Sequence, residues 1–344
     1  MAFEFTSGES AGDGIRRMAR QQIDKALDEI ADGDLDNQRT VHQVRKRCKK
    51  LRALLRLARG DLDVTGKVYQ RENICFRDAA RSLSNVRDAQ AILETCDNLV
   101  ATVSGQRNRE RLKTLRDVLE AQKQTSSSHN DDLNERLDAF AVTFLEARAR
   151  VHTWPIGDGF NSLAPGLKKN YRQGRKAMLK AARQSGTAHF HDWRKRVKYH
   201  FYHMQVLAPI WKGVLKPWKN EIKRLGEDLG DEHDLAVFTQ MLSQNPGAIL
   251  SRRDLDALRA LSWERRTRLQ TRTLSLGQRI FAEKPKHLTS RLDTCWQASL
   301  AASAQATKTF EHHTFNKHKS HHTRASVLPS CCFGKREKQS PRAT

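Results

Sequence analysis

Two short segments of this sequence repeat the same arrangement of basic side chains. The segment His42–Lys49 has the sequence HQVRKRCK, and His191–Lys198, starting 149 residues later, has the sequence HDWRKRVK. Positions 0, 3, 4 and 7 of such a segment share one face when the segment is helical. The common frame H-x-x-R-K-R-x-K therefore places a histidine and three cations in a row on each of two helices. Because like charges at this spacing repel, we expect a polyanion to lie against each row.

Each motif lies in a segment with the apolar period of an amphipathic helix. In the first segment, the positions expected in the core are Val44, Cys48, Leu51, Leu55 and Ala58. The equivalent positions of the second segment are Trp193, Val197, His200, Met204 and Leu207. The side chains expected on the binding faces are His42, Arg45, Lys46, Lys49, Arg52 and Arg56 in the first helix, and His191, Arg194, Lys195, Lys198 and, further along, Tyr202 in the second.

A charged helix face is usually a solvated surface on which Glu and Lys alternate. Between Arg39 and Gly60, however, there is no acidic residue, and the same spacing of cations recurs in the second half of the chain. We therefore interpret both rows as binding faces. A helix of 20 residues is about 30 Å long, so one row can follow several consecutive phosphate groups.

A third basic segment comes directly before the second motif. Residues 166–183 carry seven Lys or Arg and no acid. A tight hairpin between this segment and the next helix would lay its cations alongside Lys195 and Lys198. The residues of this segment that we expect to bind are Lys169, Arg172, Arg175 and Lys176.

The motif histidines leave several roles open. His42 and His191 can act as donors to phosphate, metal ligands, phosphate acceptors or structural braces. A single histidine flanked by cations is a poor metal site, because the neighbouring charge repels the ion; we therefore predict no metal site. His200 lies on the apolar stripe and is predicted to be a core histidine.

The net charge points to an anionic partner. Lys and Arg number 62 against 39 Asp and Glu, which gives a formal charge of +23 over 344 residues. Residues 308–344 hold eight Lys or Arg and two acids, a net of +6, so residues 1–307 keep +17. Nucleic acid, anionic lipid and polyphosphate are the partner classes that fit. No apolar stretch approaches ~18 residues, so we expect a cytoplasmic protein that does not enter a membrane.

Nearly all of the remaining sequence has helical periodicity, which predicts an all-α fold. The expected helices span 15–30, 36 or 40 to 58, 66–84, 86–103, 107–124, 131–152, 161–183, 187–207, 216–230, 234–242, 252–282 and 286–304. Trp154–Gly159 is the clearest break, and it separates a first half of about 9–153 from a second half of about 160–306. Residues 307–344 are predicted to be a disordered basic tail rich in His and Lys.

A second pair of segments supports an internal duplication. Leu83–Ala89 corresponds to Leu229–Leu235 at an offset of 146, close to the offset of the histidine motifs. Asp88 and Asp234, at equivalent places, are predicted to cap a helix or orient an arginine. A repeat of this length favours two similar helical bundles that face each other over a solenoid.

Together these motifs resemble those of the CHAD family, the conserved histidine α-helical domain. The segments Leu167–Lys176 and Leu276–Lys286 carry the resemblance further, and it covers roughly residues 9–306. It implies two four-helix-bundle-like halves related by a pseudo-two-fold axis, with a basic cavity between them that binds inorganic polyphosphate. The residues that match the two motifs are His42, Arg45, Lys49, Arg52, His191, Arg194 and Lys198. Phe201 departs from the pattern, since the family usually has Arg at that offset.

The function predicted from these observations is non-enzymatic binding of inorganic polyphosphate, with recruitment to cytoplasmic polyphosphate granules and no cofactor. A nucleic-acid-binding protein is the first alternative, although the motif helices lack Asn or Gln base readers and aromatic stacking platforms. A polyphosphate-processing enzyme is the second. Phosphoryl transfer usually needs Mg²⁺ held by carboxylates and a phosphate-cradling loop, and neither a Walker loop nor an acidic cluster accompanies the basic helices.

Overall fold

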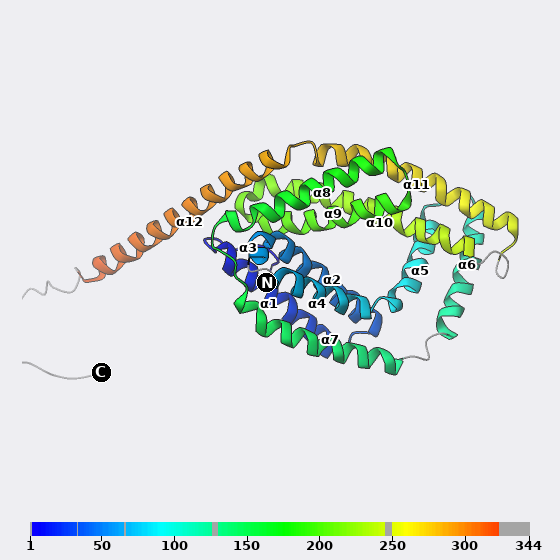
Figure 1. Cartoon of the computed structure of the whole chain (residues 1–344), viewed down its shortest axis with the longest axis horizontal. Coiled ribbons are helices and arrows are strands. Elements are labelled where there is room, and N and C mark those ends of the chain that lie inside the picture. The colour runs from blue at the N-terminus through cyan, green and yellow to red at the C-terminus, as the bar shows by residue number, and fades with distance from the viewer. Residues whose placement is uncertain (1, 33, 65–66, 126–129, 245–249, 323–344) are drawn as a thin grey trace, which may run out of the picture. The chain divides into compact units, whose positions relative to one another are not determined.

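The computed structural model describes residues 2–32, 34–64, 67–125, 130–244 and 250–322 (Figure 1). It divides into two units, Met1–Ser299 and Leu300–Thr344, and both histidine motifs belong to the first. Throughout the described ranges the secondary structure is helical, without a strand, as the sequence predicted. Those same ranges hold no helix with the length and apolarity that a membrane crossing requires.

The part of the chain before the predicted break at residues 154–159, called the first half below, is built around the helix that carries the first motif. Its α-helices are α1 (Ala11–Ala31), α2 (Asn37–Leu57), α3 (Arg59–Val64), α4 (Val68–Ser82), α5 (Asn85–Thr102), α6 (Gln106–Thr125) and α7 (Asn130–Arg150). Helix α2 packs against α1 on one side and α4 on the other, and α7 completes this group by contacting both α1 and α4. The first motif therefore sits on a central helix whose apolar face is covered.

The second half follows two short 3-10 turns, η1 (Val151–Thr153) and η2 (Phe160–Ser162). Its elements are α8 (Ala164–Arg183), α9 (Thr187–Leu207), the 3-10 turn η3 (Ala208–Trp211), α10 (Lys212–Gln244), α11 (Arg252–Ile280) and α12 (Pro285–His322). Helix α9, which carries the second motif, packs between α8 and α10, and α11 runs along α10 (Figure 1). The predicted hairpin between α8 and α9 is confirmed.

Local sequence explains how the two motif helices begin and end. The side chain of Asp36 caps α2 by accepting a hydrogen bond from the backbone N–H of Arg39, at 2.8 Å. Helix α9 spans Thr187–Leu207, the range predicted from the sequence. All ten predicted core positions of the two helices are buried, so the period of 3.6 correctly identified their inner faces.

The largest differences from the predicted boundaries are in α10 and α12. The sequence around Gly230 predicted a break between two helices, but α10 is continuous from Lys212 to Gln244. Asp234 therefore lies inside a helix and does not cap one. The backbone of α12 is helical as far as His322, beyond the predicted end at residue 304, and residues 323–344 of the predicted tail lie outside the described ranges.

The two halves touch along α2, which contacts both α8 and α9. At the start of α8, the backbone of Gly166 lies directly on the end of α2. A Cβ added there would lie 2.1 Å from the carbonyl oxygen of Leu57 and 2.2 Å from that of Arg56. Only glycine allows this approach. A separate apolar cluster joins the far ends of α5 and α6 to those of α10 and α11, with Leu99 and Phe238 among its buried members.

Candidate functional site: the basic surface of α2, α8 and α9

The first motif row runs along α2 beside α4. His42, Lys46 and Lys49 are exposed, whereas Arg45 is half-buried and its Nη1 donates to the carbonyl oxygen of Ala80 on α4, at 2.7 Å. This contact holds the arginine against the neighbouring helix. The row therefore forms the edge of a surface that α2 and α4 share.

The row continues toward the C-terminal end of α2 through Arg52 and Arg56. Both donate to the side-chain oxygen of Asn73 on α4, from Nε of Arg52 at 3.3 Å and from Nη1 of Arg56 at 3.0 Å. One neutral amide thus holds two cations next to each other. The amide carries no charge, so this contact orients both guanidinium groups without neutralising them.

The second motif row lies along α9 where it packs on α10. Two glycines of α10, one turn apart, leave room for its cations: Gly226 lies beside Lys198, and Gly230 lies beside the guanidinium group of Arg194. Burial lowers the pKa of Lys198, and the charge of Arg194 lowers it further. Close helix packing thus holds these cations in a partly dehydrated position. A bound anion would interact with them more strongly there than it would with cations in water.

His191 faces a second histidine that the motif does not contain. Its ring packs against that of His233 on α10 in a tilted arrangement, with 4.3 Å between centroids and 34° between planes. Burial lowers the pKa of both rings to about 4, with contributions from Arg194 and Lys195. Within the described structure, the buried Nδ1 atom of each ring has no hydrogen-bond partner. Both rings are therefore neutral near pH 7 and hold unused hydrogen-bonding capacity.

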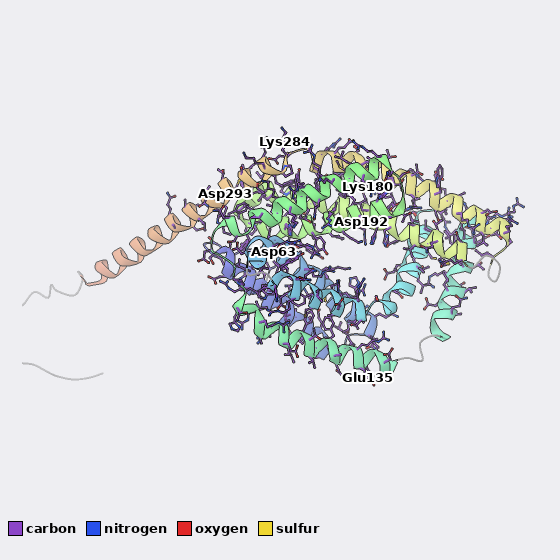
Figure 2. All side chains as sticks on the ribbon, viewed as in Figure 1. Asp63, Glu135, Lys180, Asp192, Lys284 and Asp293 are labelled. Atoms are coloured by element: carbon purple, nitrogen blue, oxygen red, sulfur yellow. The ribbon has the colours of Figure 1, made fainter. Side chains whose placement is uncertain are left out.

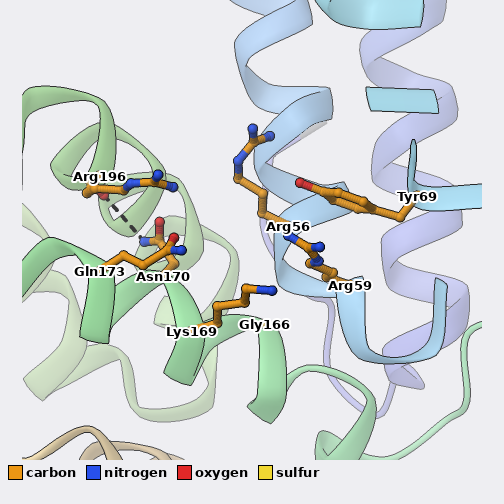
Figure 3. Close-up of a pocket in the computed structure, with 8 residues that line it drawn as sticks. All are labelled: Arg56, Arg59, Tyr69, Gly166, Lys169, Asn170, Gln173 and Arg196. Carbon is orange, nitrogen blue, oxygen red and sulfur yellow. Dashed lines mark hydrogen bonds between the residues drawn. The ribbon is translucent and has the colours of Figure 1, made fainter. Parts of the chain in front are cut away.

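A pocket of about 190 Å³ lies where the two halves meet (Figure 3). Helices α2, α3 and α4 form one wall, and α8 and α9 form the other. Its lining residues are Arg56, Arg59, Tyr69, Gly166, Lys169, Asn170, Gln173 and Arg196. The side chains of Arg196 and Lys169 extend across the pocket toward the arginines of the opposite wall (Figure 3).

Aromatic rings hold the two arginines of the first wall. The guanidinium group of Arg56 lies over Tyr199 of α9, at 4.1 Å from the ring centroid, and that of Arg59 lies over Tyr69, at 4.3 Å. Arg59 also forms an ion pair with Asp63, at 2.7 Å. Stacking on a ring leaves the N–H groups at the edges of a guanidinium group available as donors. Both groups are therefore held in one orientation and keep N–H donors for a ligand.

The charge of the pocket is not neutralised within the described part of the chain. No described carboxylate lies within 4.0 Å of the charged groups of Arg56, Lys169 or Arg196. Burial lowers the pKa of Arg56, and the charges of Arg52 and Arg196 lower it further. A buried cation costs free energy unless an anion accompanies it. The pocket therefore has the properties of an anion-binding site.

The α8 residues predicted to bind do not all reach this pocket. Lys169 lines it, whereas Arg172 and Lys176 are exposed and Arg175 is half-buried near Tyr171. Lys176 instead lines a shallow depression at the end of α8 together with Lys180, which Figure 2 labels. Only one part of the α8 row therefore faces the first half.

Tyr202 requires a correction, because its side chain is only 8% exposed and packs edge-on against Phe3. The N-terminal segment covers the end of α9 at this point, so Tyr202 belongs to the core and not to the binding face. Lys195 does lie on the exposed face, where it pairs with Asp192 at 3.2 Å (labelled in Figure 2). His200 is fully buried, as predicted, and burial lowers its pKa to about 3.

Sequence reasoning missed several residues of the pocket, and Arg196 is the most informative. It occupies offset 5 of the repeated frame, a position that the first copy fills with Arg47. In the structure Arg47 forms a largely buried ion pair with Glu29, whereas Arg196 points into the pocket. The arginine that both copies share at this offset could have pointed to a binding residue, but its two copies have different roles. Within the described ranges, no three His, Cys, Asp or Glu side chains gather as metal ligands would.

Comparisons with known proteins identify similarity over most of the chain. The sequence profile of the CHAD domain family matches residues 17–243. The crystal structure of the CHAD domain from the plant Ricinus communis has a similar fold, with a TM-score of 0.52 and 18% sequence identity, covering 78% of this chain and 90% of that one. A search among proteins with curated descriptions gave no match.

Proposed function

Since the chain belongs to the CHAD domain family, we propose that it binds inorganic polyphosphate without chemically transforming it. The ligand lies against the two motif rows and the pocket between the halves. The binding residues we propose are His42, Arg45, Lys46, Lys49, Arg52, Arg56, Lys169, His191, Arg194, Lys195 and Lys198, with Arg59 and Arg196 added from the pocket. Arg172, Arg175 and Lys176 extend the basic surface along α8.

The observation that carries this proposal is the group of cations that lines the pocket. Its charged residues come from both halves of the molecule, and three of them have no carboxylate partner among the described residues. Folding has thus brought together like charges, which repel each other more strongly in a partly buried site than in water. A polyanion that occupies the site offsets this repulsion, because each cation is then attracted to a phosphate group.

The physics of binding is electrostatic. Each Lys or Arg that contacts a phosphate group releases counterions condensed on the polymer, so affinity falls steeply with salt. Arginine forks can bind phosphate oxygens at two points, whereas lysine acts as a point charge. Polyphosphate has no bases, and the proposed site needs no base-reading side chain.

The order of the helices supports the proposed pseudo-two-fold relationship of the halves. The motif helices α2 and α9 are each preceded by a long helix that packs on them, α1 and α8. In the first half α4 and α5 follow the motif helix with a short break at residues 83–84, where the second half has the single helix α10. In this arrangement the two rows face a common basic cavity, and the pocket forms part of its wall.

Nucleic acid remains the competing ligand, because its phosphates offer the same charge. Calorimetric titration with long-chain polyphosphate at near-physiological salt, with duplex DNA of equal total charge as competitor, separates the two. Binding that DNA does not displace supports the proposal. Equal affinities for the two polymers would overturn polyphosphate selectivity, and phosphate release above background with Mg²⁺ or Mn²⁺ would overturn the non-enzymatic assignment.

The cellular role we propose is recruitment to polyphosphate granules in the cytoplasm. A fluorescent fusion of the full chain should colocalise with granules in cells that accumulate polyphosphate. The same fusion should become diffuse when polyphosphate synthesis is abolished. Granule localisation that persists without polyphosphate would require a different partner.

A further inference from the structure

The pocket between the halves lies at one end of a row of cations. On α2 the row passes through Arg52 to Arg56, which Asn73 joins by accepting hydrogen bonds from both side chains. Arg56 is also a lining residue of the pocket. A polyanion that follows the row on α2 therefore arrives at the pocket.

At the pocket, the end of α2 is covered by the start of α8. The backbone of Gly166 lies directly on the carbonyl groups of Arg56 and Leu57, so that even a Cβ would collide with them. Past this contact, α3 carries Asp63, which pairs with Arg59, and Asp61, which accepts a hydrogen bond from the backbone N–H of Gly157 at 2.9 Å. Close backbone packing and negative charge both oppose the passage of a polyphosphate chain.

The size and charge of the pocket fit a terminal phosphate group. Its volume of about 190 Å³ leaves room for a compact anion such as a single phosphate group. A phosphate group bonded through a single oxygen carries about −1.5 to −2 charges at pH 7, whereas an internal group of the polymer carries one. The four cations of the lining favour the more highly charged group.

Two neutral side chains of α8 complete the lining. Asn170 and Gln173 of α8 line the pocket beside Lys169, and the amide nitrogen of Asn170 donates to the carbonyl oxygen of Arg196, at 3.3 Å. This hydrogen bond joins α8 to α9 under the arginine. The amide group of Gln173 supplies N–H donors that a phosphate oxygen can accept. The terminal group has three non-bridging oxygens, which the donors of the two walls can share.

From this geometry we infer that the pocket of Arg56, Lys169 and Arg196 recognises the free end of a polyphosphate chain, with the remainder of the chain lying along the α2 row. The inference rests on the proposed function and specifies its binding mode. A linear polymer has two ends whatever its length. A chain too short to lie along a whole row can therefore still be bound through one end. The ends, and not the interior, set the affinity for short chains.

The test compares polyphosphate of one defined length with free ends and with both ends capped as phosphoramidates of a small neutral amine. Calorimetry on the full chain should give binding about tenfold tighter for free ends, the value of one charge-assisted contact of about 1.5 kcal/mol. Linear tripolyphosphate should also compete better than cyclic trimetaphosphate, which has no end.

A matched pair of variants assigns the effect to the pocket. In Lys169→Gln/Arg196→Gln, free and capped chains should bind equally, while weaker binding along the rows persists. The control Arg252→Gln/Arg253→Gln removes the same charge from exposed positions at the start of α11 and should keep the preference for free ends. Helical circular dichroism verifies that both variants fold.

The outcomes are distinguishable. Equal affinity of the unmodified protein for free and capped chains overturns end recognition but leaves polyphosphate binding intact. Failure to bind either polymer overturns the proposed function itself. A preference for free ends that survives in Lys169→Gln/Arg196→Gln places end recognition elsewhere and overturns the assignment to this pocket.

Discussion

The guanidinium group of Arg56, at the end of α2, lies over the ring of Tyr199 on α9, at 4.1 Å from the centroid. This contact joins the helices that carry the two histidine motifs. It also orients a cation that burial would otherwise disfavour, because the ring face compensates part of its charge. The proposed binding surface and the contact between α2 and α9 therefore share this pair of residues.

Removing the ring should weaken polyphosphate binding without unfolding the protein. A cation–π contact contributes about 0.5–2 kcal/mol, so Tyr199→Leu should lower affinity about 2- to 30-fold in calorimetric titration. Tyr199→Phe keeps the ring and should bind like the unmodified protein. An equal loss in both variants would assign the effect to the tyrosine hydroxyl and contradict the role of stacking.

The row on α2 can be tested through the salt dependence of binding. Arg45→Ala/Lys49→Ala removes two cations of the first motif, so the slope of log K against log salt should become shallower by about 2. Helical circular dichroism should be unchanged, since the buried face of α2 is intact. Arg252→Ala/Arg253→Ala is the control, because cations in the first turn of a helix do not stabilise it. An equal change of slope in the control would mean that only net charge matters.

The packed histidines His191 and His233 predict how stability changes with pH. The pKa of His191 and His233 is about 4 in the folded protein, against about 6.5 in an unfolded chain. Between these values the unfolded chain binds more protons, so the free energy of unfolding falls as pH falls from about 6.5 to about 4. His200 and His203, whose pKa burial lowers to about 3, add to the same trend.

Chemical denaturation at a series of pH values checks this prediction. His191→Gln/His233→Gln should show a shallower loss of stability below pH 6.5 than the unmodified protein, with the remainder due to His200 and His203. Bound polyphosphate should oppose the loss, because its negative charge favours protonated rings beside Arg194 and Lys195. Identical pH profiles for the two proteins would show that His191 and His233 do not titrate in this window.

Gly166 should be essential for the contact between the halves. In Gly166→Ala the new Cβ would meet two backbone carbonyl oxygens at 2.1 and 2.2 Å, so α8 must move away from α2. We expect a loss of stability of about 2–3 kcal/mol, comparable with overpacking in a core, together with weaker polyphosphate binding. Gly213→Ala on α10 is the matched control, because nothing lies within 4 Å of its added Cβ.

The control should be neutral or slightly stabilising, since alanine favours a helix over glycine by about 0.5–1 kcal/mol. Thermal unfolding followed by circular dichroism measures both variants. Similar melting temperatures for Gly166→Ala and the unmodified protein would mean that the halves adjust to the extra atom, and that the pocket does not depend on this close approach.

Helix faces were predictable because they depend on local spacing. The buried stripes of α2 and α9 follow the period of the α-helix, and the hairpin between α8 and α9 follows from a short connection. The break predicted near Gly230 was wrong because tertiary contacts override a weak local preference. There α10 is held against α11 by ion pairs of Asp228 with Arg272 and of Glu232 with Arg266.

By itself, the sequence determined that two helices each carry a basic row, that the fold is all-α, and that the family is CHAD. Only the tertiary structure decided which cations meet. Arg56, Lys169 and Arg196 converge because α2 crosses α8 and α9, and Tyr202 is buried because Phe3 covers it. Periodicity describes the faces of one helix at a time, whereas a pocket depends on how helices distant in sequence cross, and that crossing is set by close contacts such as that of Gly166 with the end of α2.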